Sequence, residues 1–308
     1  MSRDRPTASA WFHRRGELAR DGWESVVDPT STGLAHTGLR IAELNPGDAL
    51  TLSVEGEERL VVPLAGSFTV KHAENGISTT TELAGRASVF AGRTDALYLS
   101  CAAEAVITGS GRVAVASSPT TEVHPSHHLA AADVPVELRG GGPASREVHD
   151  LCTPAVLAAA RMIVCEVVTP SGNWSSYPPH KHDSHRPGAE SRLEEIYYFE
   201  AAPVGGAERV AGTAAFGSFA TYASDERDIA IAELVRSGDI ALVPYGYHGP
   251  AAAAPGYDLY YLNVMAGPDP ERRWLIADDP AHEWVRRTWP SAGFDPRLPF
   301  TSLEKEQR

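Results

Sequence analysis

The chain has 308 residues, of which 43% are hydrophobic and 22% are charged, as in an ordinary folded protein. This composition excludes an intrinsically disordered chain and a collagen-like fibre. Lys and Arg number 27 against 40 Asp and Glu, so the formal charge is -13, and the arginines are scattered along the chain. Because an acidic surface repels a phosphate backbone, we expect no nucleic-acid partner.

The cysteines and the first residues indicate the cellular compartment. Cys101, Cys152 and Cys165 include no C-x-x-C pair, which predicts neither a disulfide framework nor a thiolate zinc site. The polar, Arg-containing residues 1–16 lack the apolar segment of a signal peptide, and no apolar run approaches the ~20 residues that cross a bilayer. We therefore expect a cytoplasmic protein without a membrane partner.

Short runs rich in β-branched and aromatic residues, bounded by Gly and Pro, predict an all-β sandwich or barrel. These runs are residues 60–64, 67–70, 88–90, 97–99, 162–168, 195–199, 239–243 and 257–264. Helix is expected only at 154–160 and 280–288.

The two halves of the chain share a rhythm, which we interpret as a weak internal repeat of one barrel type. In each half a strand ending in a Gly or Ala turn is followed by a glycine-led apolar strand, residues 85–90 and 238–243. A surface linker is predicted from the sequence Arg-Gly-Gly-Gly-Pro at 139–143. The predicted divisions are a first barrel at 1–135, a linker at 136–150, a second barrel at 151–268 and a C-terminal extension packing on the barrels at 269–308.

A cluster of histidines and glutamates in the second half predicts a metal site. His180 and His182 form an H-x-H pair, whose side chains point the same way in a strand. Glu194 and Glu195 open the following apolar strand, and His248 ends the sequence Pro-Tyr-Gly-Tyr-His after a glycine-led strand. Three imidazoles and one carboxylate suit a first-row divalent metal with positions left open for water or substrate. His185, in the intervening loop, is an alternative to one of the pair.

The first half lacks such a set. Its matching strand offers Glu57, Glu58 and Arg59, and His72 is the only histidine nearby. We therefore expect a first barrel that binds no metal and instead packs, dimerises or covers the mouth of the second barrel.

The order of these residues resembles the cupin pattern, in which one motif supplies H-x-H and Glu and a second supplies P-x-G and the last His. More narrowly, residues 173–183 and 256–268 resemble signatures of the 5-deoxy-glucuronate isomerases, bicupin enzymes of myo-inositol breakdown. Shorter matches lie at 62–67, at 85–90, and at Arg139-Gly140-Gly141 together with Arg146. The chain departs from the general cupin pattern in a longer gap before Glu194 and in Ala201, where a glycine is usual.

The resemblance implies two cupin barrels with few short helices and a metal in the second barrel. The cupin pattern places Glu194 rather than Glu195 at the ligand position, and the inward alternation of Glu194 with Ile196 and Tyr198 agrees with it. The implied metal ligands are His180, His182, Glu194 and His248, with Glu194 and His248 also catalytic. Zinc, manganese, iron and nickel all suit this set.

The implied reaction is an aldose–ketose isomerisation of 5-deoxy-glucuronate to 5-dehydro-2-deoxy-gluconate, by an enediol or a hydride shift. Its substrate is a small sugar acid, whose carboxylate needs a cation and whose hydroxyls need hydrogen-bond partners. The candidate substrate-binding residues are Arg146, Arg192, Tyr245, Tyr247 and Tyr261. The alternatives are another metal-dependent cupin enzyme, such as a dioxygenase or a related uronate isomerase, and a non-catalytic sugar-binding cupin. The oligomeric state is open, with a homo-oligomer as one option.

Overall fold

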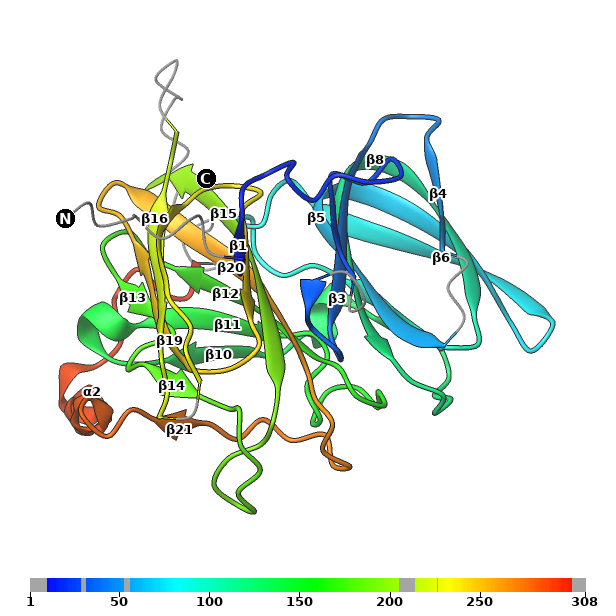
Figure 1. Ribbon diagram of the computed structural model, residues 1–308. Coiled ribbons are helices and arrows are strands. Elements are labelled where there is room, and N and C mark those ends of the chain that lie inside the picture. The colour runs from blue at the N-terminus through cyan, green and yellow to red at the C-terminus, as the bar shows by residue number, and fades with distance from the viewer. Residues whose placement is uncertain (1–9, 29–31, 53–55, 205–213, 226, 301–308) are drawn as a thin grey trace, which may run out of the picture.

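The computed structural model describes residues 10–28, 32–52, 56–204, 214–225 and 227–300. Two β-barrels lie side by side, one from the N-terminal half (blue to cyan) and one from the C-terminal half (green to orange) (Figure 1). The predicted all-β class with two barrels and few short helices is confirmed. Within the described ranges, no helix has the length and apolar character needed to span a membrane.

The N-terminal barrel is an eight-stranded sheet. Its strands are β2 (Ser25–Val27), β3 (Gly38–Leu44), β4 (Ala49–Leu52), β5 (Glu57–Glu74), β6 (Ile77–Arg86), β7 (Ala96–Leu99), β8 (Glu104–Pro119) and β9 (His127–Leu129). The main order is β2-β3-β8-β5-β7-β9, with β4 added to β8 and β6 added to β5. The two long strands β5 and β8 pair along nearly their whole length and shift register next to Gly66, where a Cβ would lie 2.0 Å from the carbonyl oxygen of Ser110. This irregularity lets the long pair curl around the barrel.

The C-terminal barrel consists of two sheets. The seven-stranded sheet, in the order β1-β18-β15-β20-β12-β11-β10, contains β1 (Phe12–His13), β10 (Val136–Arg139), β11 (Arg146–Asp150), β12 (Ile163–Thr169), β15 (Glu194–Pro203), β18 (Ile240–Val243) and β20 (Tyr257–Ala266). The six-stranded sheet contains β13 (Trp174–Ser175), β14 (His180–Lys181), β16 (Gly217–Tyr222), β17 (Ile231–Val235), β19 (Tyr247–Ala253) and β21 (Ala277–Asp278).

Helices are short and few among the described residues. They are the 3₁₀ helices η1 (Ala131–Asp133), η2 (Gly142–Ala144) and η4 (Glu283–Thr288) and the α-helix α2 (Trp289–Ala292). The helix predicted at 280–288 corresponds to η4, which continues into α2. The helix predicted at 154–160 is wrong, because that segment is a turn followed by irregular chain.

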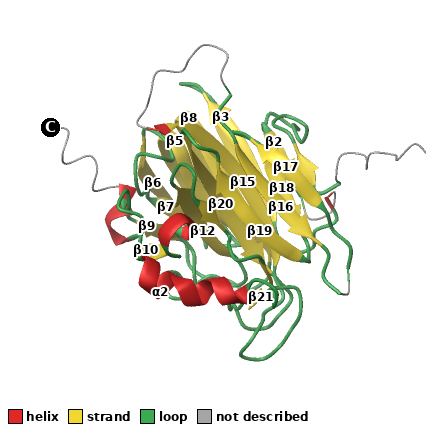
Figure 2. Ribbon diagram, turned by 90° about the vertical axis from the view of Figure 1, so that its left-hand side faces the viewer, coloured by secondary structure: helices red, strands yellow, loops and turns green. Residues whose placement is uncertain are grey.

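The strand pairing differs from the predicted domain division in two places. The predicted linker 136–150 is the hairpin β10–β11, which pairs Val136 with His149 and Arg139 with Arg146 at one edge of the seven-stranded sheet. The glycines that suggested a linker form the turn of this hairpin. Strand β1 also crosses the predicted boundary, because Phe12 pairs with Ala241 of β18 in the second barrel. Of the described part of the predicted C-terminal extension, β21 pairs with β14, and Figure 2 shows α2 near β10 and β21.

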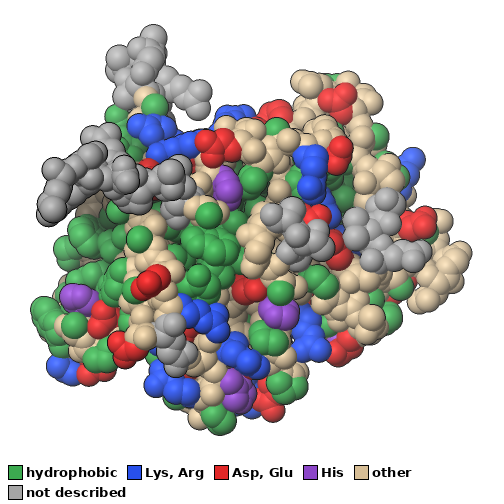
Figure 3. All heavy atoms as spheres, viewed as in Figure 1, with side chains coloured by type: hydrophobic (Ala, Val, Ile, Leu, Met, Phe, Trp, Pro, Cys, Tyr) green, Lys and Arg blue, Asp and Glu red, His purple; other side chains and the backbone are tan. Residues whose placement is uncertain are grey.

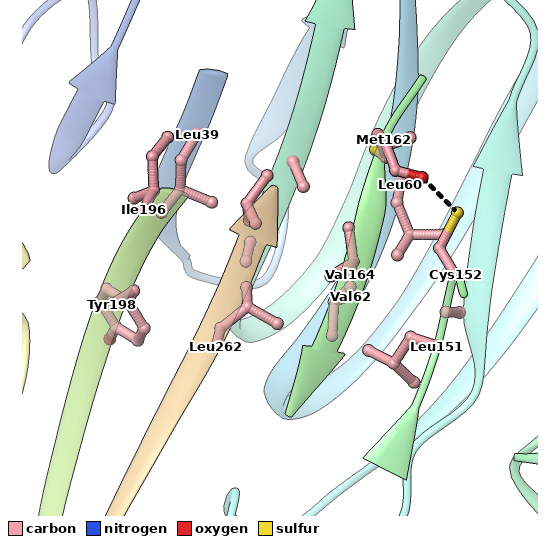
Figure 4. Close-up of a cluster of buried hydrophobic side chains, with 14 of the residues drawn as sticks. Leu39, Leu60, Val62, Leu151, Cys152, Met162, Val164, Ile196, Tyr198 and Leu262 are labelled. Atoms are coloured by element: carbon pink, nitrogen blue, oxygen red, sulfur yellow. Dashed lines mark hydrogen bonds between the residues drawn. The ribbon is translucent and has the colours of Figure 1, made fainter. Parts of the chain in front are cut away.

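A hydrophobic core joins the two barrels, in addition to one core inside each of them. In the joining core, Leu39, Leu60 and Val62 of the first barrel pack with Ile196 and Leu262 of the second (Figure 4). The neighbouring residues Tyr197, Phe199 and Tyr261 instead lie in the core inside the second barrel. Strands β15 and β20 are therefore buried on both faces, which explains their nearly unbroken apolar sequences.

The surface seen in Figure 3 carries acidic and basic side chains interspersed with hydrophobic and neutral ones. On this face the described Lys and Arg side chains do not gather into one basic patch, in keeping with the acidic balance of the sequence.

Candidate metal centre

Both sheets of the C-terminal barrel contribute side chains to one cluster in its interior. His180 on β14 and His248 on β19 are direct cross-strand partners, which places their imidazoles on the same face. His182 follows β14, and Glu195 comes from β15 in the opposite sheet. One ligand atom from each of His182, Glu195 and His248 lies within 4.8 Å of the others. The ring of His180 lies 4.5 Å from that of His248, centroid to centroid.

Backbone carbonyls fix the protonation of all three imidazoles. The Nδ1 atoms of His180 and His182 lie 3.0 Å from the carbonyl oxygens of Pro178 and Leu193, and Nδ1 of His248 lies 3.3 Å from that of Gly246. Because a carbonyl only accepts hydrogen bonds, each Nδ1 carries a proton in these contacts, so each imidazole presents its Nε2 to the cluster. This is the arrangement that orients histidines as metal ligands.

Glu195 closes the cluster from the other side. Its Oε2 lies 3.1 Å from Nε2 of His182 and 3.0 Å from Nε2 of His248, while Asn263 on β20 donates a 2.5 Å hydrogen bond to Oε1. The amide of Asn263 thus fixes which carboxylate oxygen faces the imidazoles. Asn263 was missed in the sequence, although a buried polar residue within an apolar run is a signal for a polar partner in the core.

The donor set fits a divalent cation. Glu195 and His248 are almost fully buried, and Nε2 of His248 has no well-angled hydrogen-bond partner among the described residues, although Oε2 of Glu195 is near. Burial by itself raises the pKa of Glu195, but the adjacent His248 and the hydrogen bond from His182 outweigh it and lower that pKa well below the usual range. Lone pairs and a carboxylate that converge in a buried site are the ligands of a first-row metal.

The prediction of Glu194 as the ligand was wrong. Glu194 points away from the cluster and accepts hydrogen bonds from the backbone N–H groups of Ala35 and His36 in the first barrel, at 2.8–2.9 Å. The alternation argument failed because β15 is apolar on both faces: Ile196 and Tyr198 face the other barrel, and Tyr197 faces the cluster. Glu194 therefore lies outside the cluster, in which Glu195 takes the place predicted for it.

His185, the alternative ligand, also lies elsewhere. Its side chain is half exposed, and its Nδ1 lies 2.9 Å from Asp269.

A cavity of about 300 Å³ opens beside His180 and Glu195. Two of the five predicted substrate-binding residues, Arg146 and Tyr261, line it. Arg146 is buried and donates from Nη1 to the carbonyl oxygens of Ala144 (3.1 Å) and Tyr177 (3.5 Å). Burial lowers the pKa of Arg146 to about 10, so it remains a cation at neutral pH.

Two hydroxyl groups that the sequence did not single out also line the cavity. Tyr197 and Ser176 share a 2.9 Å hydrogen bond between their hydroxyl oxygens. Burial raises the pKa of Tyr197 well above its usual range, so this phenol keeps its proton. Ser176 has a φ of 48°, a conformation that L-residues seldom adopt and that often marks a functional site.

The other three predicted substrate-binding residues do not line the cavity. Arg192 is exposed and pairs with Asp269 at 3.0 Å. Tyr245 packs edge-to-face on Trp11, and Tyr247 stacks on Tyr222 with ring centroids 5.4 Å apart. Tyr245 lies in the turn before β19 and Tyr247 is the first residue of β19, and both rings pack on neighbouring elements.

Comparison with known proteins supports this assignment of the fold. A solved structure of an IolB-like protein from Salmonella typhimurium LT2 superimposes with a TM-score of 0.78 at 32% identity, covering 89% of this chain and 98% of that one. Bacillus subtilis oxalate decarboxylase, a cupin-fold protein, gives a TM-score of 0.58 at 12% identity over 89% of this chain and 81% of that one.

Two relatives found by sequence have a higher identity to this chain than those two structures have. A protein from Bacillus velezensis, named 5-deoxy-glucuronate isomerase, is 37% identical over 262 residues, which cover 84% of this chain and 91% of the relative. A protein of the same name from Halalkalibacterium halodurans is 36% identical over 88% of this chain and 96% of its own length. A sequence profile of the KduI/IolB family matches residues 11–285. The chain thus belongs to the KduI/IolB family.

Proposed function

We propose that the protein is a metal-dependent aldose–ketose isomerase that converts 5-deoxy-glucuronate to 5-dehydro-2-deoxy-gluconate in inositol catabolism. The observation that carries the proposal is one cavity that has a His and Glu ligand set at His180 and Glu195 and a buried arginine at Arg146. This pairing suits a molecule with reactive oxygens at one end and a carboxylate at the other. The relatives named above, which carry the name of this isomerase, span nearly the whole chain.

His180, His182, Glu195 and His248 would hold the metal. Zinc, manganese, iron and nickel all suit these donors, and the oxalate decarboxylase of the same fold contains Mn(II) centres. When bound, a divalent metal supplies Lewis acidity that polarises a carbonyl and a neighbouring hydroxyl.

The remaining residues of the cavity bind and orient the sugar acid. Arg146 presents a delocalised cation whose Nε and Nη2 have no hydrogen-bond partner in the described part of the chain, so these donors are available to a carboxylate. Tyr197 keeps its proton and donates a hydrogen bond to a sugar oxygen, while Ser176 holds the phenol in place. Tyr261 lies on the same wall, where burial raises its pKa and keeps it a donor too.

Proton NMR of the purified protein with 5-deoxy-glucuronate tests the proposal. We expect conversion to the ketose, loss of conversion after treatment with a chelator, and recovery when a divalent metal is added back. His185→Ala is a matched control, because His185 lies near the ligands in the sequence but outside the cluster. Absence of conversion by a folded, metal-loaded protein would contradict the proposed substrate, and conversion that survives complete metal removal would contradict the role of the metal.

A further inference from the structure

Three arginines converge on the cavity of this acidic protein. Arg139, Arg146 and Arg286 all line it. Arg139 and Arg146 are direct cross-strand partners in the β10–β11 hairpin, an arrangement of like charges that destabilises a sheet. Burial is the main cause of the lowered pKa of Arg146, and the nearby charges of Arg139 and Arg286 lower it further. A grouping of like charges is unfavourable unless anions compensate each of them.

The carboxylates near these arginines leave one charge uncompensated. Arg139 pairs with Glu137 at 2.7 Å. Arg286 donates from Nε and Nη2 to the two carboxylate oxygens of Asp278, the second at 2.6 Å. Arg146 has no carboxylate within ion-pair distance among the described residues and uses one nitrogen on backbone carbonyls. Arg146 is thus the member of this arginine cluster that is left to pair with the carboxylate of a bound molecule, because Glu195, the other carboxylate of the lining, faces His182 and His248.

The C-terminal segment holds two of these guanidinium groups against one indole ring. The guanidinium of Arg286 lies 4.9 Å from the ring centroid of Trp289, and that of Arg146 lies 5.4 Å from it. Such cation–aromatic contacts fix the plane of an arginine. Trp289 therefore sets the position of Arg146 relative to Arg286.

Glycines in the hairpin make this contact possible. A Cβ on Gly141 would lie 2.7 Å from Cα of Trp289, and a Cβ on Gly140 would lie 2.9 Å from Nη1 of Arg146. The amide of Gly142 also donates a 2.7 Å hydrogen bond to the carbonyl of Gly293. The C-terminal segment thus packs directly against the backbone of these glycines.

The same segment is tied to the metal-ligand strand. Asp278, which holds Arg286, is the cross-strand partner of His180 on β14. Arg286, on η4, is therefore held at the cavity by a residue of β21, the strand that pairs with β14 of the proposed metal site.

We propose that Arg286 and Trp289 determine specificity, because they complete with Arg146 a subsite that binds the substrate carboxylate and selects sugar acids over neutral sugars. This inference rests on the proposed function for the identity of the sugar acid. The preference for a carboxylate itself follows from the arginine cluster.

Binding of D-glucuronate and D-glucose, which differ in a carboxylate against a hydroxymethyl group, measures this preference by isothermal titration calorimetry. We expect the wild-type protein to bind glucuronate at least about tenfold more tightly than glucose, as charge-assisted hydrogen bonds predict. Arg286→Gln and Trp289→Leu should each reduce the ratio of glucuronate to glucose affinity by about three- to tenfold. Arg286→Lys, which keeps the charge, should restore part of it, and Arg146→Gln should abolish it.

Matched controls lie in the same segment. Arg287→Gln removes an equal charge at an exposed position outside the cavity, and Trp284→Leu removes an exposed indole. Both should leave the ratio unchanged, and thermal melts should show that every variant is folded. A merely structural role of Arg286 would change the melting temperature without changing the ratio.

Two results would overturn the inference: a wild-type protein that fails to prefer glucuronate, or an Arg286→Gln variant whose ratio stays within twofold of the wild-type value. Activity separates this failure from that of the proposed function. If the wild-type protein converts 5-deoxy-glucuronate but Arg286→Gln leaves the ratio of glucuronate to glucose affinity unchanged, the proposed function holds and the proposed subsite is wrong. If the affinity ratio depends on Arg286 but the protein does not convert 5-deoxy-glucuronate, the proposed subsite holds and the proposed reaction is wrong.

Discussion

The two barrels place a pair of charged residues at corresponding points of a central strand and use them differently. In β5 of the first barrel the pair is Glu58 and Arg59, and in β15 of the second it is Glu194 and Glu195. In each strand the first member shares its face with residues of the core that joins the barrels, such as Leu60 and Ile196. The second member points into its own barrel.

The first member of each pair, Glu58 or Glu194, binds backbone N–H groups of the other barrel. Glu58 accepts 2.7 Å hydrogen bonds from the backbone N–H groups of residues 160, 161 and 162 in the second barrel, and a hydroxyl hydrogen bond from Tyr98. Glu194 accepts hydrogen bonds from two N–H groups of a loop in the first barrel. Each barrel therefore anchors a loop of the other through a carboxylate.

The second members explain why a metal is expected in one barrel only. Arg59 is buried and donates to the carbonyl oxygens of Ser100 (2.9 Å) and Ala103, so a cation already fills the interior position. In the second barrel that position carries Glu195, which faces His182 and His248. The charge of this interior residue, together with the imidazoles of the second barrel, thus distinguishes the two barrel interiors.

The largest expected effect comes from removing the imidazoles that distinguish the second barrel. His248→Ala should lower turnover of 5-deoxy-glucuronate by about 1,000-fold or more, because a polarising metal contributes several kcal/mol. Its metal content, measured by mass spectrometry after dialysis, should fall in parallel. His128→Ala, in the first barrel, should change neither quantity. Full activity with bound metal in His248→Ala would contradict the assignment.

A pH-dependent contribution to stability is expected where the barrels meet. Arg86 of the first barrel pairs with the buried Glu166, which also contacts His149 at 3.3 Å, and Glu147 lies 2.7 Å from the same imidazole. Burial lowers the pKa of His149, but the hydrogen bonds to Glu147 and Glu166 outweigh it and raise that pKa to about 9.

A raised folded-state pKa stabilises the fold fully below the unfolded pKa of about 6.5, and this stabilisation is lost as the pH rises through about 9. Urea unfolding at pH 6.5 and pH 9.5 should therefore show a loss of about 3 kcal/mol from this residue. The loss should be absent in His149→Phe. An identical pH dependence in wild type and variant would argue against the charged imidazole.

The two anchoring carboxylates should differ in their contribution to stability. Glu58→Ala leaves buried N–H donors without a partner and should lower the free energy of unfolding by about 2–3 kcal/mol. Glu194→Ala affects partly exposed donors, which water can satisfy, and should cost about 1 kcal/mol. Denaturant unfolding measures both, and a larger effect of Glu194→Ala would contradict the comparison.

A smaller effect is expected at the residue that orients the interior carboxylate. Asn263→Ala removes the hydrogen bond to Oε1 of Glu195 and should weaken metal binding by about tenfold, as loss of a residue behind a ligand does. Competition with a chelator of known affinity measures this change. Unchanged affinity would show that Glu195 is oriented without the amide.

The sequence was sufficient for the features that depend on local spacing. Short strands bounded by glycines and prolines predicted the barrels, and the positions of His180, His182 and His248 predicted three members of the cluster. Alternation could not distinguish Glu194 from Glu195, because both faces of β15 are buried, one against the other barrel. That information lies in the packing of the barrels and not in the strand itself.

The hairpin β10–β11 was taken for a linker for a related reason. Its glycines have the composition of a linker, and only the docking of Trp289 shows why side chains are excluded there. Likewise, Tyr245 and Tyr247 flank Gly246 close to His248, yet their rings pack on other elements. Closeness in the sequence identified the ligands but not the cavity wall, which the distant C-terminal segment completes.

The measurement that tests this account most directly compares metal content in two neighbouring variants, Glu194→Gln and Glu195→Gln. Both lose one negative charge on the same strand, but only Glu195 faces the imidazoles. We expect Glu194→Gln to retain metal at the wild-type level and Glu195→Gln to lose it after dialysis. Retention of metal by Glu195→Gln together with its loss from Glu194→Gln would contradict the central claim that the interior carboxylate of β15 defines the metal centre.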